Sequence, residues 1–584
     1  MPHRPWRAIA LIFFCLVLAA APRAAELQLE VPRQALPLGV DDARPVVAAH
    51  GMVASQEWHA TQVGLDVLRR GGNAVDAAVA VALTLAVTLP KAGNLGGGGF
   101  MLVHLAKPRK DVVIDYRETA SRDTGHDVFL DEHGDAVPAK SRDSGLGVGV
   151  PGTVAGLTHA LTAYGSGKFT FADLAAPAIA LARDGFPVED DLALSLPYAA
   201  ARLGHWPASA KIFLHADGTP LGRGEKLVQS DLAESLAAIA AGGAKAFYEG
   251  PIAAKIAAAV TAAGGHMTTA DLAAYQVRER VPLRGTYRGH EILAVPPPSS
   301  GGLHILQILN ILEGFSLTEQ DALTPRALHL MAEAMKLAYA DRAEYLGDPD
   351  FVSVPVAGLV SKAYAARLRQ EIDADHARPA ADIKPENPLP YESDQTTHFS
   401  IVDRDGNAVA NTYTLNFSYG LGLVAAGTGI LLNNELDDFA AKPGVPNAFG
   451  LTGGAANAPG PQHRPLSSMA PTMVFRDGEL ELVTGSPGGS RIITIVLEIL
   501  LDVLDFDMNI AAATAAPRMH DQWMPDELQL EPGLPQTTIA ALEKLGHKVV
   551  MRPPWGSAQS IARHDGLLFG AADPRQLGTS AAGY

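Results

Sequence analysis

The stretch Gln395–Val402 reads QTTHFSIV, a run of β-branched and aromatic residues that is typical of a strand. It follows a polar segment, residues 379–394, in which four prolines favour an extended linker. Asp405-Gly406-Asn407 then predicts a turn, and residues 408–414 predict the returning strand. A linker that leads into a β-hairpin therefore divides the chain near residue 395.

The segments on either side of this hairpin have opposite orders of elements. Between about Ser55 and Lys362, Ala-rich helical stretches alternate with short apolar runs, and Ser55 is a candidate N-cap for the first helix. After the hairpin, short strands precede a long apolar helix. This order predicts an α+β fold in which helix layers enclose stacked sheets. The expected helices are 77–89, 173–182, 232–241 and 491–503, and the expected strands are 112–114, 291–295, 429–432 and 472–475.

Composition is that of a globular chain with more than one packed unit. The 584 residues exceed what a single core normally holds, and 47% of them are hydrophobic. The 46 Lys and Arg are outnumbered by 63 Asp and Glu, which gives a net charge of −17 and argues against a nucleic-acid partner. The single Cys excludes internal disulfides and a Cys-based zinc site.

The N-terminus has the pattern of a secretory signal. Arg4 and Arg7 precede an apolar run, residues 8–21, and small residues follow through Ala25. A membrane anchor is the alternative, but the run is shorter than the roughly 20 residues that a spanning helix needs. We therefore expect residues 1–25 to be a removable signal peptide. The remaining chain would be periplasmic or secreted, without a membrane span.

Neither a cofactor nor a metal is expected from local motifs. Residues 147–152 match the GxGxxG spacing of a dinucleotide loop, but Pro151 removes a backbone donor and no strand–turn–helix context surrounds it. The chain contains no HExxH motif, and its 19 His show no spacing typical of metal ligands.

Several strings, taken in order, resemble the γ-glutamyltranspeptidases (glutathione hydrolases) of the N-terminal-nucleophile hydrolase superfamily. The resemblance runs from about Ala49 to the C-terminus, and it implies a four-layer αββα sandwich. The strings are Asp115–Ala120 (DYRETA), Pro298–Gly302 (PSSGG), Gln395–Ser400 (QTTHFS), Thr414–Asn416 (TLN), Leu432–Phe439 (LNNELDDF), Arg464–Met469 (RPLSSM) and Gly485–Ser490 (GSPGGS).

Thr396 is the candidate nucleophile. A Thr hydroxyl attacks poorly unless a base removes its proton. Cleavage of the Gln395–Thr396 bond would give Thr396 a free α-amine, whose reference pKa of about 7.7–8.0 suits a base near neutral pH. The resemblance implies that Thr396 makes this cut itself. A large subunit, 26–395, and a small subunit, 396–584, would then stay associated as a heterodimer.

Other residues match the charges of a γ-glutamyl head group, which carries an α-carboxylate and an α-ammonium. Arg117 offers a planar fork for the carboxylate, and the hydroxyls of Ser467 and Ser468 can add donors to it. Glu435 and Asp438 supply negative charge for the ammonium. The Asn416 carbonyl adds an acceptor.

The resemblance gives three further residues a role in catalysis. Thr414 is expected to steady the Thr396 hydroxyl. Gly488 and Gly489 lack side chains that would block close approach, so their N–H groups can point at a developing oxyanion.

Each of these residues also has an ordinary structural interpretation. Arg117 could form a surface ion pair with Asp115 or Glu118, residues 437–438 could be a solvated turn, and residues 488–489 could be a bend. Two functional alternatives remain as well. One is a glutaryl or cephalosporin acylase on the same scaffold, and the other is a non-catalytic protein that binds γ-glutamyl compounds. The leading hypothesis is an exported γ-glutamyltransferase and glutathione hydrolase that uses water, amino acids or dipeptides as acceptors.

Overall fold

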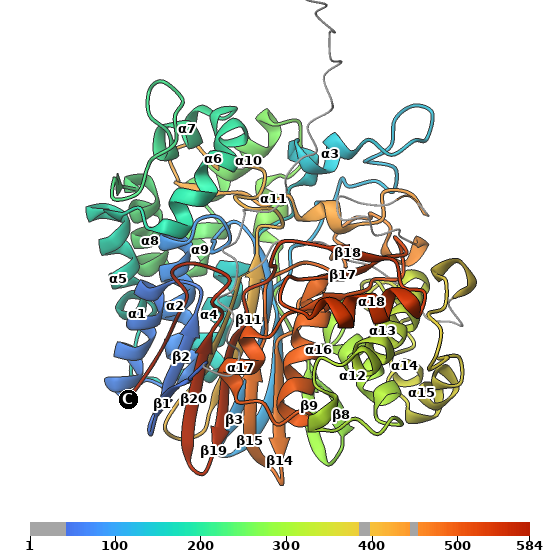
Figure 1. Ribbon diagram of the computed structural model, residues 1–584. Helices are drawn as coiled ribbons and strands as arrows, with labels where there is room; N and C mark the ends of the chain where they lie inside the picture. The colour runs from blue at the N-terminus through green and yellow to red at the C-terminus, as the bar shows by residue number, and fades with distance from the viewer. Residues whose placement is uncertain (1–42, 385–396, 444, 446–453) are drawn as a thin grey trace, which may run out of the picture.

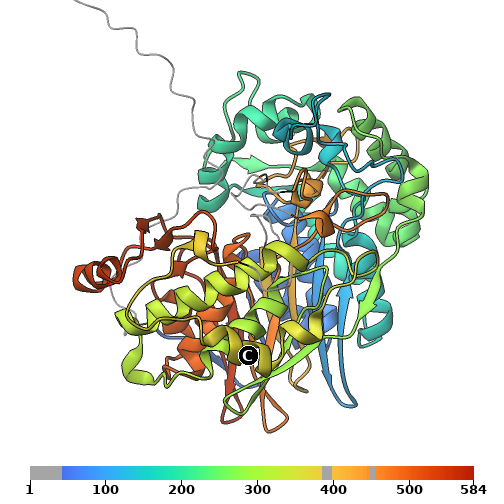
Figure 2. The same ribbon diagram turned by 90° about the vertical axis from the view of Figure 1, so that its right-hand side faces the viewer.

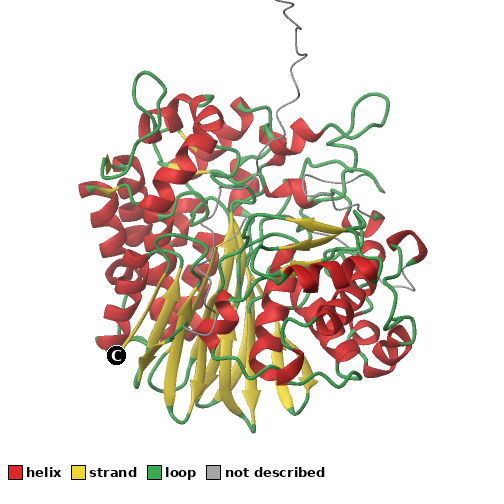
Figure 3. Ribbon diagram, viewed as in Figure 1, coloured by secondary structure: helices red, strands yellow, loops and turns green. Residues whose placement is uncertain are grey.

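Two seven-stranded sheets form the centre of the molecule in a computed structural model that describes residues 43–384, 397–443, 445 and 454–584. Figure 3 shows the strands gathered at the centre with helices on both sides. The β10 sheet has the order β21 (Ser580–Gly583), β2 (Met52–Ser55), β10 (Thr397–Val402), β11 (Ala408–Thr414), β3 (Gly98–Ala106), β4 (Arg109–Asp115) and β7 (Arg278–Arg280). The β14 sheet has the order β1 (Val46–Ala48), β20 (Leu567–Ala572), β19 (Gln559–His564), β15 (Glu479–Thr484), β14 (Thr472–Arg476), β9 (His290–Ala294) and β8 (Leu283–Tyr287).

Three apolar cores identify the order of the layers. One core joins the β10 sheet to the helices on its outer face, and a second joins the β14 sheet to another set of helices. The third lies between the sheets and contains residues of both, such as Phe100 of β3 and Met473 of β14. The expected four-layer αββα sandwich is therefore confirmed.

The alternation of residues in β10 places it between two layers. Phe399 and Ile401 belong to the core against the helices, whereas Val402 belongs to the core between the sheets. The Ser400 hydroxyl, on the same face as Val402, donates to the backbone oxygen of Gln559 at 2.8 Å. Because side chains alternate across a strand, this register fixes which residues of β10 face each layer.

The helices over the β10 sheet include α1 (Trp58–Arg69) and α2 (Ala74–Thr88), on the left of Figure 1. Every residue of α2 is buried, as its Ala-rich apolar sequence predicts. Ser55 ends β2 and does not cap α1, so that prediction is wrong. Glu57 is the cap, because its carboxylate accepts from the amides of His59 and Ala60. The other helices of this half are α4 (Thr153–Tyr164), α5 (Phe171–Asp184), α6 (Asp190–Gly204), α7 (Pro207–Phe213), α8 (Ser230–Gly242), α9 (Ala244–Tyr248), α10 (Pro251–Ala262) and α11 (Thr269–Ala273).

The β14 sheet is covered by α12 (Gly301–Leu312), α13 (Pro325–Tyr345) and α16 (Arg491–Leu504). Figure 2 shows α12 to α15 in front of the orange strands of this sheet. The expected strands at 112–114, 291–295 and 472–475 correspond to β4, β9 and β14, and the expected helix at 491–503 corresponds to α16. The smaller elements are α3 (Pro138–Arg142), α14 (Val356–Leu359), α15 (Lys362–Arg369), α17 (Ile510–Ala515), α18 (Gln536–Lys544), β5 (Phe186–Pro187), β6 (Lys226–Leu227), β12 (Val424–Ala425), β13 (Ile430–Leu431), β16 (Met519–His520), β17 (Leu528–Leu530) and β18 (Val549–Met551).

Three sequence predictions fall wholly or mostly on residues outside the described ranges. These are the signal peptide, 1–25, the linker, 379–394, and the cleavage site between Gln395 and Thr396. Among the described residues, no helix combines the length and the apolar composition needed to cross a bilayer.

Candidate functional site

The hairpin of β10 and β11 brings the ends of two strands together at the site. Thr396 lies outside the described residues, but Thr397, which follows it, is the first residue of β10 and pairs with Tyr413. Thr414 is the next residue of β11 and its last. The hairpin therefore holds the residue after the candidate nucleophile at the same end of the sheet as Thr414.

A tight turn after β11 orients Asn416. Its backbone φ is +75°, a left-handed conformation that Asn tolerates better than most residues. The Asn416 amide donates to the Thr414 hydroxyl at 2.8 Å, and its side-chain nitrogen donates to the backbone oxygen of Asn434 at 2.9 Å. Asn434 directly precedes Glu435, so the turn joins two of the predicted site strings.

The glycine run at residues 96–99 supports the end of β11. A Cβ atom at Gly97 would lie 1.9 Å from the backbone oxygen of Thr414, so only glycine fits there. Asn94 donates to the same Thr414 oxygen at 2.8 Å, and its own side-chain oxygen accepts from the amide of Gly97 at 3.0 Å. This packing fixes the backbone on which Thr414 sits.

Arg117 follows the end of β4 and is fully buried, which excludes the surface ion pair considered from the sequence. Its two terminal nitrogens form charged hydrogen bonds with Glu435 and Asp438, which lie on one 3₁₀ turn, Glu435–Asp438. The guanidinium group also donates to the backbone oxygens of Pro465 and Leu466, each at 3.1 Å. Three of the predicted site strings thus meet at one guanidinium.

This head-group cluster consists of Arg117, Glu118, Glu435 and Asp438, all buried. It contains three carboxylates and one guanidinium, and the Glu118 carboxylate lies 3.9 Å from Arg117. Among the described residues, no donor reaches either oxygen of Glu118, and one oxygen each of Glu435 and Asp438 also lacks a donor. The cluster therefore has more negative charge than its own cation balances.

Burial has a clear electrostatic effect on these carboxylates. It raises the pKa of Glu118, and repulsion from Glu435 raises it further. Burial also raises the pKa of Glu435 and Asp438, although the adjacent Arg117 opposes the change. The Arg117 guanidinium is itself disfavoured by burial, but its anionic neighbours raise its pKa, so it stays charged. A second cation in this space would lower the pKa of these carboxyl groups and so favour their ionised form.

Ser467 and Ser468 follow the two carbonyls that accept from Arg117. The Ser467 hydroxyl accepts from the amide of Met469 at 3.1 Å. The Ser468 hydroxyl accepts from the guanidinium of Arg342 at 3.3 Å, and Arg342 also donates to Ser300 at 3.0 Å. Because both serine oxygens accept bonds here, their O–H groups can still donate to a ligand.

Gly488 and Gly489 lie between β15 and α16 and are buried. Both have positive φ, +141° and +61°, which glycine adopts readily. Their carbonyls accept from Arg491 and Ile492, whereas neither amide donates a hydrogen bond within the described part of the chain. Buried amides normally have partners, so this turn leaves two donors available to a ligand atom.

Several residues that serve the site were not predicted. Glu118 was considered only as an ion-pair partner of Arg117. Arg342 and Asn457 lie in no sequence motif that indicated a role at the site. Asn457 donates to the Asp438 backbone oxygen at 2.7 Å and accepts from the amide of Leu466 at 3.1 Å, so it fixes two site segments together. A lone polar residue in a loop gives no periodic pattern, so only the fold identifies it.

Comparison with known proteins agrees with this geometry. The sequence model of the family described as gamma-glutamyltranspeptidase matches residues 60–583, nearly the whole chain. The chain belongs to this family. The glutathione hydrolase proenzyme of Escherichia coli (strain K12) is 51% identical over 571 residues, which cover 98% of this chain and 97% of that protein.

Solved structures that are similar to this chain have the same fold. The cephalosporin acylase from Bacillus halodurans has a TM-score of 0.81 and 29% identity, and covers 93% of this chain and 97% of that chain. The γ-glutamyltranspeptidase from Helicobacter pylori has a TM-score of 0.56 and 42% identity, and covers 59% of this chain and 97% of that chain. The family is catalytic, so the chain is an enzyme of the N-terminal-nucleophile class.

Proposed function

We propose that this enzyme is a glutathione hydrolase and γ-glutamyltransferase. The observation that carries the proposal is the head-group cluster, in which three buried carboxylates surround one guanidinium. A γ-glutamyl head group supplies the positive charge that this space lacks. Its ammonium would neutralise carboxylates that have no donor, and its carboxylate would bind to part of the Arg117 guanidinium and accept from the two serine hydroxyls.

Binding requires an exchange of partners inside the cluster. In the structure, Arg117 pairs with Glu435 and Asp438. An incoming α-carboxylate replaces part of that pairing, while the α-ammonium takes the carboxylates that are released. Since one cation and one anion enter together, the net charge of the buried site does not change. A zwitterion can therefore use both halves of the site, whereas a simple acid brings no cation for the released carboxylates and a simple amine leaves the two serine hydroxyls without an acceptor.

The nucleophile is proposed to be Thr396, exposed by cleavage of the Gln395–Thr396 bond. The Thr396 hydroxyl attacks the preceding carbonyl, the peptide nitrogen becomes the free α-amine of Thr396, and water hydrolyses the resulting ester. The products are the subunits 26–395 and 396–584. They would remain together because β10 and β11 of the second lie between β2 and β3 of the first.

In the proposed reaction with substrate, the Thr396 oxygen attacks the γ-carbonyl carbon. The α-amine of Thr396 takes the hydroxyl proton, and the amine leaving group departs with a proton as the C–N bond breaks. The product is a γ-glutamyl ester on Thr396. Water, or the amino group of an amino acid or dipeptide, then attacks this ester and releases glutamate or a new γ-glutamyl amide.

Two backbone amides are proposed to stabilise the negative charge that develops on the carbonyl oxygen. The amides of Gly488 and Gly489 are buried donors without partners in the described chain, and one oxyanion-hole donor is worth about 3 kcal/mol. Thr414 is proposed to steady the Thr396 hydroxyl, and Asn416 to accept from the substrate ammonium. The Asn434 contact holds the Asn416 side chain in place.

The two alternatives from the sequence are less well supported. An acylase that acts on a glutaryl side chain has no α-ammonium to bind, so it gains nothing from three buried carboxylates. A non-catalytic binding protein needs the head-group cluster but not the two glycine amides. An exported location, periplasmic or secreted, stays part of the proposal because it rests on the signal pattern of residues 1–25.

The test compares two chromogenic donors that differ only in the α-amino group, γ-glutamyl p-nitroanilide and glutaryl p-nitroanilide. We expect kcat/KM to favour the γ-glutamyl donor at least about 100-fold, because the glutaryl donor leaves the carboxylates unpaired. Equal or faster turnover of the glutaryl donor would support the acylase. Binding of L-glutamate by an uncut chain that releases no anilide would support the binding protein.

A further inference from the structure

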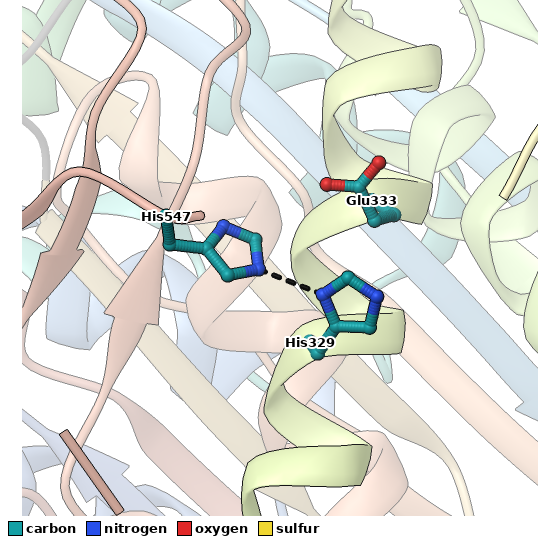
Figure 4. Close-up of side chains that lie close together, drawn as sticks. All are labelled: His329, Glu333 and His547. Atoms are coloured by element: carbon teal, nitrogen blue, oxygen red, sulfur yellow. Dashed lines mark hydrogen bonds between the residues drawn. The ribbon is translucent and has the colours of Figure 1, made fainter. Parts of the chain in front are cut away.

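A second cluster of polar side chains lies away from the site, between α13 and the segment that joins α18 to β18. His329 and Glu333 are four residues apart on α13 and so face the same side of the helix. His547 reaches them from the other segment, and all three residues are buried. Figure 4 shows the two imidazoles facing each other with the Glu333 carboxylate beside them, and each residue offers a ligand atom within 4.8 Å of the others.

The hydrogen bonds of His329 fix which of its nitrogens is available. Its Nε2 lies 2.7 Å from the backbone oxygen of Asp373, and a carbonyl oxygen only accepts, so Nε2 carries the proton. In the neutral ring, Nδ1 therefore holds a lone pair. Metal-binding histidines typically have this arrangement, in which the nitrogen away from the metal donates to a carbonyl.

The second imidazole is aimed at that lone pair. His547 Nε2 lies 2.8 Å from His329 Nδ1, so in this state His547 donates to His329. The His547 Nδ1 atom is buried and has no hydrogen-bond partner among the described residues. If the proton of His547 moved from Nε2 to Nδ1, two lone pairs would face the same point.

We propose that His329 Nδ1, His547 Nε2 and the Glu333 carboxylate bind one divalent transition-metal ion, with Zn²⁺ the best fit. Two imidazoles and one carboxylate are a common zinc ligand set. Two atoms each about 2.0–2.1 Å from a tetrahedral ion lie about 3.3 Å apart, so the 2.8 Å separation of the two nitrogens needs only a small widening. The fourth position remains for water.

Lys336 competes with the ion for Glu333. Its ammonium lies 2.8 Å from the Glu333 carboxylate and 2.9 Å from the backbone oxygen of Arg378. The amide of Arg378 also donates to Glu333, at 3.2 Å. A bound ion must therefore displace or share this ion pair, so Lys336 weakens metal binding. Removal of its charge should strengthen it.

The proposed metal site would join the two subunits. His329 and Glu333 precede the proposed cut at residue 395, whereas His547 follows it. The ion would then connect the large and small subunits by direct bonds. Only this consequence rests on the proposed function, since the site itself needs no cleavage. The separation of 218 residues between the two histidines explains why the sequence gives no ligand pattern.

The test uses the full protein after treatment with a chelator and its removal. Zn²⁺ binding is measured by calorimetry, and Co²⁺ binding by the absorption bands of a tetrahedral site. We expect one ion per chain with a Kd of about 1 μM or below. His547→Gln should bind at least about 100-fold more weakly. The matched control is His564→Gln, which changes a histidine whose side chain is 78% exposed and should not affect binding.

Lys336→Met provides a second and opposite test. It removes the competing ammonium and retains an apolar chain, so Zn²⁺ should bind about tenfold more tightly. Equal Zn²⁺ affinity in the wild type and His547→Gln would overturn the proposal, and so would weaker binding by Lys336→Met. Hydrolysis of γ-glutamyl p-nitroanilide by the metal-free His547→Gln protein is measured separately. The two measurements are independent. Absence of Zn²⁺ binding by the wild type with retained hydrolysis would contradict only the metal site, and absence of hydrolysis with retained Zn²⁺ binding would contradict only the proposed activity.

Discussion

Two of the fully buried charged clusters in the described part of the chain differ in balance. The paired-arginine cluster consists of Arg518, Glu531, Asp573 and Arg575, and its two cations match its two anions. Both of its carboxylates accept several hydrogen bonds, including ones from the backbone amides of Trp555 and Ala558. The head-group cluster has three carboxyl groups against one guanidinium, and no described donor reaches four of the carboxyl oxygens.

The difference separates a cluster that stabilises the fold from one that awaits a ligand. Burial alone would raise the pKa of Asp573, but Arg518 and Arg575 outweigh it and lower the pKa. In the head-group cluster the balance is reversed, and the pKa of Asp438 is raised. Equal burial therefore has opposite consequences, because a buried charge is stable only where its partners are complete.

The largest expected effect is on stability and comes from the balanced cluster. Arg575→Met leaves Glu531 and Asp573 with one cation between them, so we expect the free energy of unfolding to fall by about 3–5 kcal/mol. Thermal unfolding measures this change. The kcat/KM of the remaining folded protein should match the wild type, and a selective loss of activity would contradict a purely structural role.

The next effect is on activity and comes from the head-group cluster. Arg117→Lys keeps the charge but removes the planar fork, so kcat/KM for γ-glutamyl p-nitroanilide should fall about 100-fold, or about 2.7 kcal/mol. Steady-state kinetics and thermal unfolding are measured together. The comparison between the clusters fails if Arg117→Lys lowers the unfolding temperature as much as Arg575→Met does.

A smaller effect is expected from Glu118→Gln, which reduces the excess of negative charge. The ammonium loses one of its three anions, so kcat/KM for the γ-glutamyl donor should fall about tenfold. Turnover of the glutaryl donor, which has no ammonium, should stay the same or rise. Equal losses for both donors would show that Glu118 acts on the fold and not on the head group.

The smallest expected effect is the release of protons when a ligand binds to the head-group cluster. The raised pKa of Glu118, Glu435 and Asp438 means that the folded, ligand-free state holds protons above the usual carboxyl range. Stability from these groups therefore declines as pH rises through that range, and a bound ammonium lowers their pKa again. L-glutamate binding at mildly acidic pH should release protons, which calorimetry in buffers of different ionisation enthalpy detects. Proton uptake would contradict this account.

The sequence predicted the hairpin and several of the long helices, because burial imposes a regular pattern on them, but it did not predict α13, which has 21 residues. The β-branched and aromatic residues of Gln395–Val402 predicted β10, and the apolar run at 77–89 predicted most of α2. The cap at Glu57 was missed because Glu is a weaker N-cap signal than the nearby Ser55. Side-chain hydrogen bonds at the ends of helices were therefore less predictable than elements with a periodic apolar pattern.

The members of the site could be predicted, but their arrangement could not. Family strings identified Arg117, Glu435 and Asp438, yet 318 residues separate Arg117 from Glu435, and no local pattern shows that they pair directly. Glu118 was assigned no role toward the ammonium because its excess charge is visible only once all three carboxylates lie together. Arg342 and Asn457 act through neighbours, which a sequence without the fold cannot show.

The most direct test of the central claim is the intact mass of the purified protein together with N-terminal sequencing of every piece. The account predicts two pieces, with the smaller beginning at Thr396, and a single uncut, inactive chain for Thr396→Ala. An active wild-type protein that stays in one piece would contradict it, as would a Thr396→Ala chain that splits and still hydrolyses γ-glutamyl p-nitroanilide.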